Sequence, residues 1–332
     1  MKAILYRAYG SPDVLRFEDI EKPTPGEGEI LVRVRAASVN PLDWHLMRGE
    51  PYVMRPMTGL RQPKDPRLGV DLAGKVEAVG TRVTRFQSGD AVFGSSGGAF
   101  AEYVCAREKE LARKPANLTF EQAAAVPVAG LTALQGLRDR GRVQPGQKVL
   151  INGAAGGVGT FAVQIAKSFG ADVTGVCSTR NVDMVHSIGA DRVIDYTRED
   201  FTASGRRYDL IFDCIPNHSL SACRRVLTHQ GMYILVGGSR RRWIAPFPRA
   251  IAALLLSRFV SQNFFMMLAK ISAEDLAVIG ELMQAGRVTP VIDRSYPLSE
   301  VPEAIRYLEE GHARGKVVIT VGRDKGIAKE AQ

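Results

Sequence analysis

Residues 148–159, KVLINGAAGGVG, constrain the fold more than any other part of this 332-residue chain. A short apolar strand at 149–151 ends in a glycine-rich turn, and a helical pattern begins directly after the turn. From Val158 to Phe169, apolar side chains recur at i, i+3, i+4, i+7, i+8 and i+11, on one face of a helix. Gly170 stands where a glycine commonly ends a helix. A strand, a glycine turn and a helix N-terminus in this order predict a site for the phosphates of a dinucleotide.

The glycines of this turn have distinct expected roles. Gly156 lacks a Cβ atom, so that a pyrophosphate can approach the backbone, and Gly159 lets the helix pack closely on the strand. Ala154 occupies the place of the first glycine of the usual fingerprint, so the turn is a variant. The alternative is a tight turn without a ligand. The residues expected to contact the cofactor here are Ala155, Gly156, Gly157 and Val158.

The strand expected at 172–177 indicates which dinucleotide is preferred. Sites for NAD commonly place an acid at the end of this strand, where it binds the ribose 2′-hydroxyl. No acid lies between Asp172 and Asp183, and Ser178, Thr179 and Arg180 follow the strand instead. Because a guanidinium can pair with a 2′-phosphate, these residues favour NADPH. The alternative is that Arg180 is a solvated loop residue.

Strands and helices continue to alternate after this point. The pattern predicts strands at 192–194, 208–213 and 232–236 and helices at 182–188 and 219–227. Alternating elements with apolar strands indicate a doubly wound parallel sheet covered on both faces. Ligands bind at the carboxyl ends of such strands, so we expect Cys214, Val236, Gly237 and Gly238 near the cofactor. Cys214 is interpreted as a small residue of the pocket wall rather than as a nucleophile.

The chain before residue 125 has a different character. Residues 30–36 alternate like a half-buried strand, and short β segments are expected at 70–80, 90–94 and 100–105. Residues 288–321 resemble this β-rich part, so the dinucleotide unit is expected to be inserted into a second domain. The expected divisions are 1–124 (first part of the β-rich domain), 125–267 (dinucleotide-binding domain) and 268–332 (return to the first domain, plus a charged tail).

Composition limits the other possibilities. Four cysteines lie far apart without a CxxC pair, which suits a reducing cytosol and offers no zinc cluster. No apolar run is long enough to cross a bilayer, and the first 20 residues contain acids and no apolar core of a signal peptide. We therefore expect a cytoplasmic protein. The net charge of +9 favours anionic ligands, and without an accompanying motif it does not indicate a specific nucleic-acid partner.

Several ordered motifs extend this pattern over roughly residues 1–322. They are VNPLD at 39–43, LGVDLAG at 68–74, GAFAEY at 98–103, AVPVAGLTA at 125–133, the turn at 153–159, and GAD with IDY at 189–196. In these motifs the chain resembles the medium-chain dehydrogenases/reductases, in the zinc-free quinone oxidoreductase branch. Within that branch it is similar to bacterial relatives of the mitochondrial reticulon-interacting proteins and of the chloroplast envelope quinone oxidoreductase homologue. The resemblance implies a Rossmann sheet inserted into a β-rich GroES-like catalytic domain.

The resemblance also argues against alcohol oxidation. Asn40 and Val70 stand where zinc-dependent relatives carry a Cys and a His ligand, and residues 128–130 fill the region of the third ligand. Without thiolate and imidazole ligands a tetrahedral zinc site cannot form, so we expect no bound metal. Reduction of a quinone or an α,β-unsaturated carbonyl needs no Lewis acid, because the nicotinamide supplies the hydride. The expected activity is thus NADPH-dependent reduction of a small apolar quinone or carbonyl substrate.

Two residues are candidates for a direct part in that reaction. Asn40 lies where the family's active-site cleft begins and is expected either to donate to a substrate carbonyl or to hold the nicotinamide ribose; the alternative is a turn residue before Pro41. Tyr52 loosely matches a tyrosine that some enoyl-reductase relatives use as a proton donor. Asp43 is expected to fix the turn or the following helix, and His45 to be structural. Trp44 is equally consistent with an apolar pocket and with the core.

The resemblance places further residues at the cofactor. Thr132 resembles the residue beside the nicotinamide, Tyr196 resembles one beside the adenosine phosphate, and Lys316 is expected to reach the cofactor from the second domain. The basic and apolar segment 239–270 is interpreted as a lid or dimer surface rather than a membrane patch, and we expect a homodimer. The alternative for the whole chain is a non-catalytic or moonlighting NADPH-binding protein that associates with nucleic acid or a membrane surface.

Overall fold

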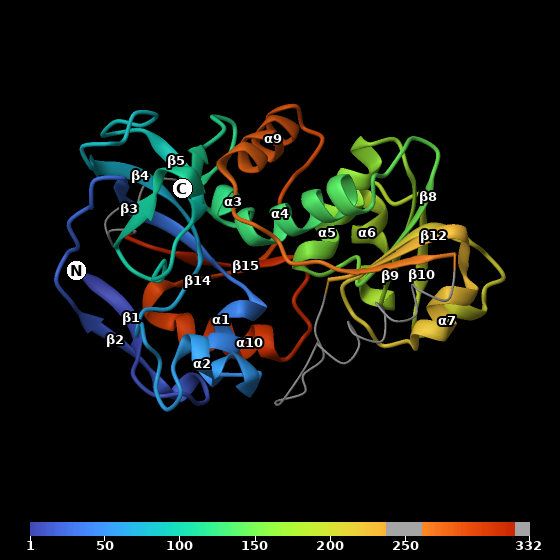
Figure 1. Ribbon diagram of the computed structural model, residues 1–332, viewed down its shortest axis with the longest axis horizontal. Coiled ribbons are helices and arrows are strands. Elements are labelled where there is room, and N and C mark those ends of the chain that lie inside the picture. The colour runs from blue at the N-terminus through green and yellow to red at the C-terminus, as the bar shows by residue number, and fades with distance from the viewer. Residues whose placement is uncertain (237–260, 323–332) are drawn as a thin grey trace, which may run out of the picture.

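The computed structural model describes residues 1–236 and 261–322. Figure 1 shows two lobes, with the N-terminal strands in one and the glycine-turn strand β8 in the other. The strands are β1 (Lys2–Tyr6), β2 (Leu15–Asp19), β3 (Glu29–Val39), β4 (Asp71–Val79), β5 (Ala91–Ser95), β6 (Tyr103–Arg107), β7 (Leu111–Arg113), β8 (Lys148–Asn152), β9 (Asp172–Cys177), β10 (Arg192–Asp195), β11 (Tyr208–Asp213), β12 (Leu227–Leu235), β13 (Asn263–Met266), β14 (Ile292–Pro297) and β15 (Lys316–Thr320).

Helices connect these strands and cover them. They are α1 (Pro41–Arg48), α2 (Arg55–Thr58), α3 (Phe120–Ala124), α4 (Pro127–Gln135), α5 (Gly157–Ser168), α6 (Val182–Ser187), α7 (Leu220–Arg225), α9 (Ala273–Gln284) and α10 (Val301–Glu309). Short 3-10 turns include Tyr52–Met54 and Thr179–Asn181. In the described part of the chain, no helix is both long and apolar enough to span a bilayer.

The dinucleotide-binding lobe contains a six-stranded sheet in the order β10-β9-β8-β11-β12-β13, with every neighbouring pair parallel. Numbered from β8, the strand order is 3-2-1-4-5-6, that of the doubly wound fold. The chain adds strands on one side of β8 up to β10 and then on the other side from β11 onward, so the order reverses between β8 and β11. Alternate residues of the strands serve opposite faces: Val149 and Ile151 belong to one apolar core, and Leu150 belongs to another. The predicted parallel sheet is therefore confirmed, and its switch point lies at the glycine turn.

The other lobe contains a mainly antiparallel sheet in the order β14-β15-β3-β4-β5-β7, with β6 paired to β3. The last strand, β15, lies beside β3, in the register Val317 with Val39. Strands from both ends of the chain therefore build one sheet, and the dinucleotide unit is inserted between them, as the sequence predicts. The exact divisions at 124/125 and 267/268 stay predictions.

Some elements differ from the sequence expectations. Strand β12 begins at Leu227, five residues before the expected Met232, because Leu227 pairs with Tyr208 across a register shift. In the segment 239–270, expected to be a lid or a dimer surface, residues Asn263–Met266 form the edge strand β13 with Phe264 buried, and this strand is not predicted from the sequence. Periodicity does not predict these two strands. Polar residues follow Leu227, and polar and apolar residues mix around Phe264, so neither segment shows a regular apolar pattern. Residues 239–260 of the expected lid or dimer surface lie outside the described residues.

Candidate active site

The glycine turn has the shape that a pyrophosphate needs. Gly156 is the N-cap of α5, and a Cβ atom at Gly156 would meet only the carbonyl oxygen of Gly153, at 3.5 Å. At Gly159 a Cβ atom would lie 2.1 Å from the same oxygen, so close packing of helix on strand requires glycine there. The first amides of a helix have no partner within the helix, and those of α5 begin at this turn. The open cradle and the helix N-terminus together fit a dinucleotide phosphate.

Residues at the ends of the neighbouring strands lie next to the glycine turn. Asn152 at the end of β8 donates to Asp213 Oδ1 at the end of β11, over 2.8 Å. Cys214 follows β11, and its Cβ atom would lie 3.3 Å from a Cβ atom at Gly153. Burial raises the pKa of the Cys214 thiol, so the thiol stays protonated and suits a pocket wall rather than a nucleophile. Val236, the last residue described before the gap, follows β12, and Gly237 and Gly238 lie outside the described residues.

The loop after β9 carries the residues expected at the adenosine ribose. Arg180 is exposed, and its Nη2 donates to the carbonyl oxygen of His312 over 2.8 Å, so it is not merely solvated. Arg314 Nη2 in turn donates to the carbonyl oxygen of Arg180 over 3.2 Å, which brings a second guanidinium to this loop. Sequence reasoning missed Arg314; the only signal was its place in the turn before Lys316. Thr179 Oγ1 donates to Asp195 at 2.6 Å.

The other expected cofactor residues occupy different positions around the sheet. Ser178 lies at the end of β9, where its hydroxyl accepts a hydrogen bond from Asn181 at 3.2 Å. Tyr196 follows β10 and is 57% exposed. Thr132 is buried on α4, where its hydroxyl donates to the carbonyl oxygen of Val128 at 2.6 Å. None of these contacts involves a cofactor, so the expected places of Ser178, Tyr196 and Thr132 beside it stay predictions.

Asn40 is buried and hydrogen-bonded at both ends of its side chain. Its Nδ2 donates to Asp71 Oδ2 at 2.9 Å, and its Oδ1 accepts from Lys316 Nζ at 2.6 Å. It is also the N-cap of α1, and its backbone amide donates to Asp43 Oδ2 at 2.7 Å. Asn40 Nδ2 also lies 3.4 Å from the carbonyl oxygen of Ser38, so the polar atoms of this side chain all have partners inside the protein. Its expected contact with a substrate carbonyl or with the nicotinamide ribose stays a prediction. Asp43 fixes the start of the helix, as predicted.

Lys316 is buried beside Asn40. Only 3% of it is exposed, and its ammonium donates to the carbonyl oxygen of Val39 at 3.2 Å and lies 3.6 Å from Asp71 Oδ2. The ammonium thus lies in a buried polar group, and its expected contact with the cofactor stays a prediction. Its stem still borders the turn, because a Cβ atom at Gly157 would lie 3.1 Å from Lys316 Cδ. We name the group of Ser38, Asn40, Asp43, Asp71 and Lys316 the junction cluster.

Burial shifts the titration of the junction cluster. Loss of solvent raises the pKa of Asp43 to about 7, with the nearby Asp71 adding to the shift. Burial also raises the pKa of Asp71, which the Lys316 charge opposes, and it lowers the pKa of Lys316. Sequence reasoning quoted Asp71 only within the motif at 68–74. An acid inside an otherwise apolar strand was the signal for its buried role.

Residues near the predicted proton donor form a separate group. Tyr52 follows Pro51 in the 3-10 turn, is partly buried, and has the guanidinium of Arg55 4.4 Å from its ring centroid. Trp44 is partly buried against the β-rich core and stacks on His45, with ring centroids 3.7 Å apart. His45 Nδ1 lies 3.1 Å from the carbonyl oxygen of Glu50, which gives it the expected structural role. Among the described residues, no three His, Cys, Asp or Glu side chains come together as a metal-binding group.

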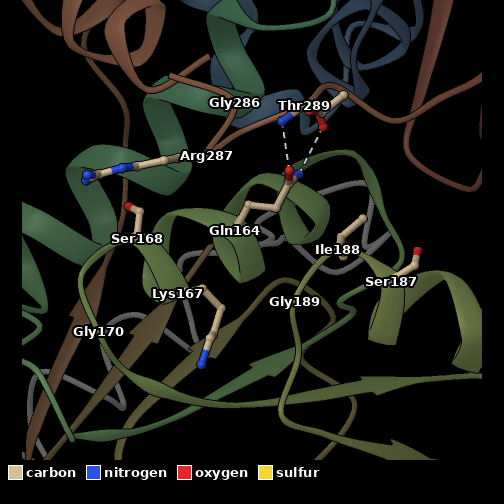
Figure 2. Close-up of a pocket in the computed structure, with 10 residues that line it drawn as sticks. All are labelled: Gln164, Lys167, Ser168, Gly170, Ser187, Ile188, Gly189, Gly286, Arg287 and Thr289. Atoms are coloured by element: carbon tan, nitrogen blue, oxygen red, sulfur yellow. Dashed lines mark hydrogen bonds between the residues drawn. The ribbon is translucent and has the colours of Figure 1, made fainter. Parts of the chain in front are cut away.

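Figure 2 shows a separate hollow at the C-terminal half of α5. At one edge of this hollow, Gln164 makes two hydrogen bonds with the backbone of Thr289. The Gln164 Nε2 donates to the carbonyl oxygen at 3.0 Å, and the Gln164 Oε1 accepts from the amide at 2.7 Å. Lys167 at the opposite edge is paired with Asp191 at 2.8 Å. The polar groups named here bond to one another, and none of the residues expected at the cofactor or the reaction lines this hollow.

Comparison with known proteins identifies the family. Residues 26–116 match the model of the alcohol dehydrogenase GroES-like domain, and residues 188–319 match that of zinc-binding dehydrogenases. The chain is 34% identical to the chloroplast envelope quinone oxidoreductase homolog of Arabidopsis thaliana, over 96% of this chain and 98% of that protein. The chain belongs to the medium-chain dehydrogenase/reductase superfamily. As a member of that superfamily it is an NAD(P)H oxidoreductase.

Two further relatives of this medium-chain dehydrogenase/reductase support the assignment. It is 33% identical to the NADPH-dependent alkenal/one oxidoreductase of Arabidopsis thaliana, over 96% of this chain and 79% of that protein. The quinone oxidoreductase of Coxiella burnetii has the same fold, with a TM-score of 0.85 and 32% identity, over 97% of this chain and 99% of that one. The resemblance in sequence motifs is thereby confirmed for fold and enzyme class.

Proposed function

We propose that this oxidoreductase transfers hydride from NADPH to a quinone or an α,β-unsaturated carbonyl without a metal ion. One observation carries the proposal: Lys316 lies between the open glycine cradle and Asn40, because its Cδ would be 3.1 Å from a Cβ atom at Gly157 and its Nζ donates to Asn40 Oδ1 at 2.6 Å. By the family resemblance, Asn40 and Val70 stand where zinc-dependent relatives carry ligands. An amide and an aliphatic side chain cannot supply the thiolate and imidazole that a zinc site needs. The named activities of two relatives, on quinones and on alkenals and alkenones, belong to the same class of acceptor.

The residues of the turn would hold the cofactor, which supplies the hydride when it is bound. The amides at the start of α5 would bind the pyrophosphate, and the absence of a Cβ atom at Gly156 leaves room for it. Arg180 and Ser178 would bind the 2′-phosphate, with Arg314 beside them. Asp195, an acid in contact with this loop, accepts hydrogen bonds from the hydroxyls of Thr179 and Thr197.

The chemistry left to the protein is orientation of the acceptor and delivery of a proton. Tyr52 is the proposed proton donor to a reduced enone, whereas a reduced quinone can take its protons from water. Asn40 fixes the N-terminus of α1 through its hydrogen bonds with Asp43 and Asp71 in the junction cluster. These roles need no Lewis acid, because the acceptor is already electrophilic.

The preference for NADPH is tested with Arg180→Ala. A charge-assisted contact to phosphate contributes roughly 1.5–3 kcal/mol, so the KM for NADPH should rise about tenfold to a hundredfold while that for NADH hardly changes. Arg192→Ala removes an exposed arginine from the opposite end of the neighbouring strand β10 and is the matched control. Equal use of NADH and NADPH by the unaltered protein would contradict the proposal.

The acceptor class is tested with a panel of quinones, 2-alkenals and simple alcohols, before and after prolonged treatment with a chelator. We expect turnover of the first two classes, negligible alcohol oxidation and no loss on chelation. Tyr52→Phe should lower enone reduction more than quinone reduction. Activity that disappears with chelator and returns with zinc would refute the metal-free reaction. Normal NADPH binding without turnover of any acceptor would favour a non-catalytic binding protein.

A further inference from the structure

Asp71 makes more contacts across the junction between the lobes than its place in a strand requires. It is fully buried at the start of β4. Its Oδ1 accepts a hydrogen bond from the backbone amide of Val128 at 3.0 Å. Its Oδ2 accepts from Ser38 Oγ and from Asn40 Nδ2, each at 2.9 Å. A single carboxylate is thereby bound to β3, to the N-cap of α1 and to the beginning of α4.

The partners of Asp71 belong to three segments that border different parts of the candidate site. Val128 lies in the first turn of α4, whose residue Thr132 is the expected neighbour of the nicotinamide. Asn40 begins α1, which leads to the segment with Tyr52. Lys316 Nζ lies 3.6 Å from Asp71 Oδ2, and the Lys316 Cδ atom would lie 3.1 Å from a Cβ atom at Gly157 of the glycine turn. Movement of the Asp71 carboxylate would therefore shift three borders of the site together.

Stability alone does not account for a carboxylate at this place. A buried charge loses its hydration, and a buried ion pair is often no more stabilising than apolar residues of the same volume. The carboxylate does offer two oxygens that can orient several donors at once, which an apolar side chain cannot do.

We propose that Asp71 is a positioning residue for the nicotinamide end of the cofactor, which it acts on through Asn40, Lys316 and the start of α4. The inference rests on the proposed binding of NADPH. The loop proposed to bind the adenosine end is held by other contacts, those of Arg180 with His312 and Arg314, none of which involves Asp71. Loss of the Asp71 charge should therefore disturb one end of the cofactor and spare the other.

Asp71→Asn tests this division with two ligands. Because hydrogen bonds to charged groups are the stronger ones, NADPH should bind the variant about tenfold more weakly and turnover should fall by about the same factor or more. Adenosine 2′,5′-bisphosphate, which lacks the nicotinamide, should bind both proteins within about twofold of each other. The fluorescence of bound NADPH reports the nicotinamide environment directly, so a changed emission gives a readout that does not depend on turnover.

Asp191→Asn is the matched control. Asp191 also accepts one backbone amide, that of Val173 at 2.7 Å, and pairs with one lysine, Lys167 at 2.8 Å, but it lies outside the junction cluster. It should leave both affinities and the emission unchanged. If Asp71→Asn does not fold, Ser38→Ala removes a single donor to the carboxylate and should give a smaller effect of the same kind.

The outcomes separate the inference from the proposed function. Selective loss of NADPH affinity and altered emission support the positioning role, even if no acceptor is turned over and the proposed reaction fails. Equal weakening of NADPH and adenosine 2′,5′-bisphosphate, or no change in either, overturns it. An equal loss in Asp191→Asn would also overturn it, because the effect would then be one of general stability.

Discussion

Asp43 has the most unusual environment of any single residue at the site. Its carboxyl is fully buried, its Oδ2 accepts the amide of Asn40, and its Oδ1 has no hydrogen-bond partner in the described structure. An ionised carboxylate is poorly accommodated there, since water is excluded and Asp71 carries a second acid into the same cluster. The raised pKa of Asp43, about 7, means that the folded state takes up a proton which the unfolded chain releases at about 3.8.

This environment predicts a pH-dependent stability. Between these two pKa values the folded state binds more protons than the unfolded state, so the stabilisation is complete below the unfolded pKa and is lost as the pH rises through about 7. Asp43→Asn keeps an oxygen acceptor for the Asn40 amide and removes the titration. From about pH 5 to about pH 8, the free energy of unfolding of the unaltered protein should fall by about 1–4 kcal/mol relative to the variant.

Urea unfolding at a series of pH values measures this difference. Asp191→Asn, at an exposed ion pair outside the junction cluster, is the control and should give a profile parallel to that of the unaltered protein. Parallel profiles for Asp43→Asn as well would show that Asp43 is ionised throughout, with Lys316 as its counter-charge.

The glycine turn is the element that the sequence described best. Its strand, helix and C-terminal glycine were all predictable because apolar periodicity and backbone requirements are local properties, and the helix observed, Gly157–Ser168, begins within the predicted turn. The junction cluster was not predictable, because its members come from β3, the start of α1, β4 and β15, which meet through the pairing of those strands. Lys316 and Asn40 were recognised as site residues, but nothing in their local sequence showed that they bond to each other.

Two alanine substitutions in the turn should separate binding from folding. At Gly156 an added Cβ atom makes only an ordinary contact, 3.5 Å from the Gly153 carbonyl oxygen, so Gly156→Ala should unfold like the unaltered protein. It should bind NADPH about tenfold or more weakly, because the Cβ atom enters the phosphate cradle. At Gly159 the Cβ atom would clash with the Gly153 carbonyl, so Gly159→Ala should cost about 1–3 kcal/mol of stability. Thermal unfolding and fluorescence titration measure the two effects. Equal stabilities for both variants would contradict the assigned roles.

The two lobes of the whole molecule are joined through its last strand. Just before β15, the amide of Gly315 donates to the carbonyl oxygen of Ala155 in the glycine turn at 2.8 Å, and Gly315 forms a parallel bridge with Gly156. The next residue, Lys316, enters the junction cluster, and β15 then pairs with β3. The C-terminal strand therefore connects the phosphate cradle of one lobe to the β-rich sheet of the other. No local pattern predicts this connection, because about 160 residues separate its two sides along the chain.

Gly315→Ala should consequently weaken stability and cofactor binding together. Gly315 has φ +92°, and a Cβ atom there would lie 2.3 Å from the carbonyl oxygen of Val291. Backbone strain and overlap should cost about 2–4 kcal/mol of stability, and displacement of the strand from Ala155 should raise the Kd for NADPH about tenfold. Gly286 is the matched control, since its φ is +70° and a Cβ atom there meets nothing within 4 Å. Gly286→Ala should cost only about 1 kcal/mol, the strain of the left-handed backbone, and leave the Kd unchanged. Urea unfolding and fluorescence titration give both quantities on the same samples. A Gly315→Ala variant that loses stability but binds NADPH normally would show that the strand supports the β-rich sheet alone and does not organise the cradle.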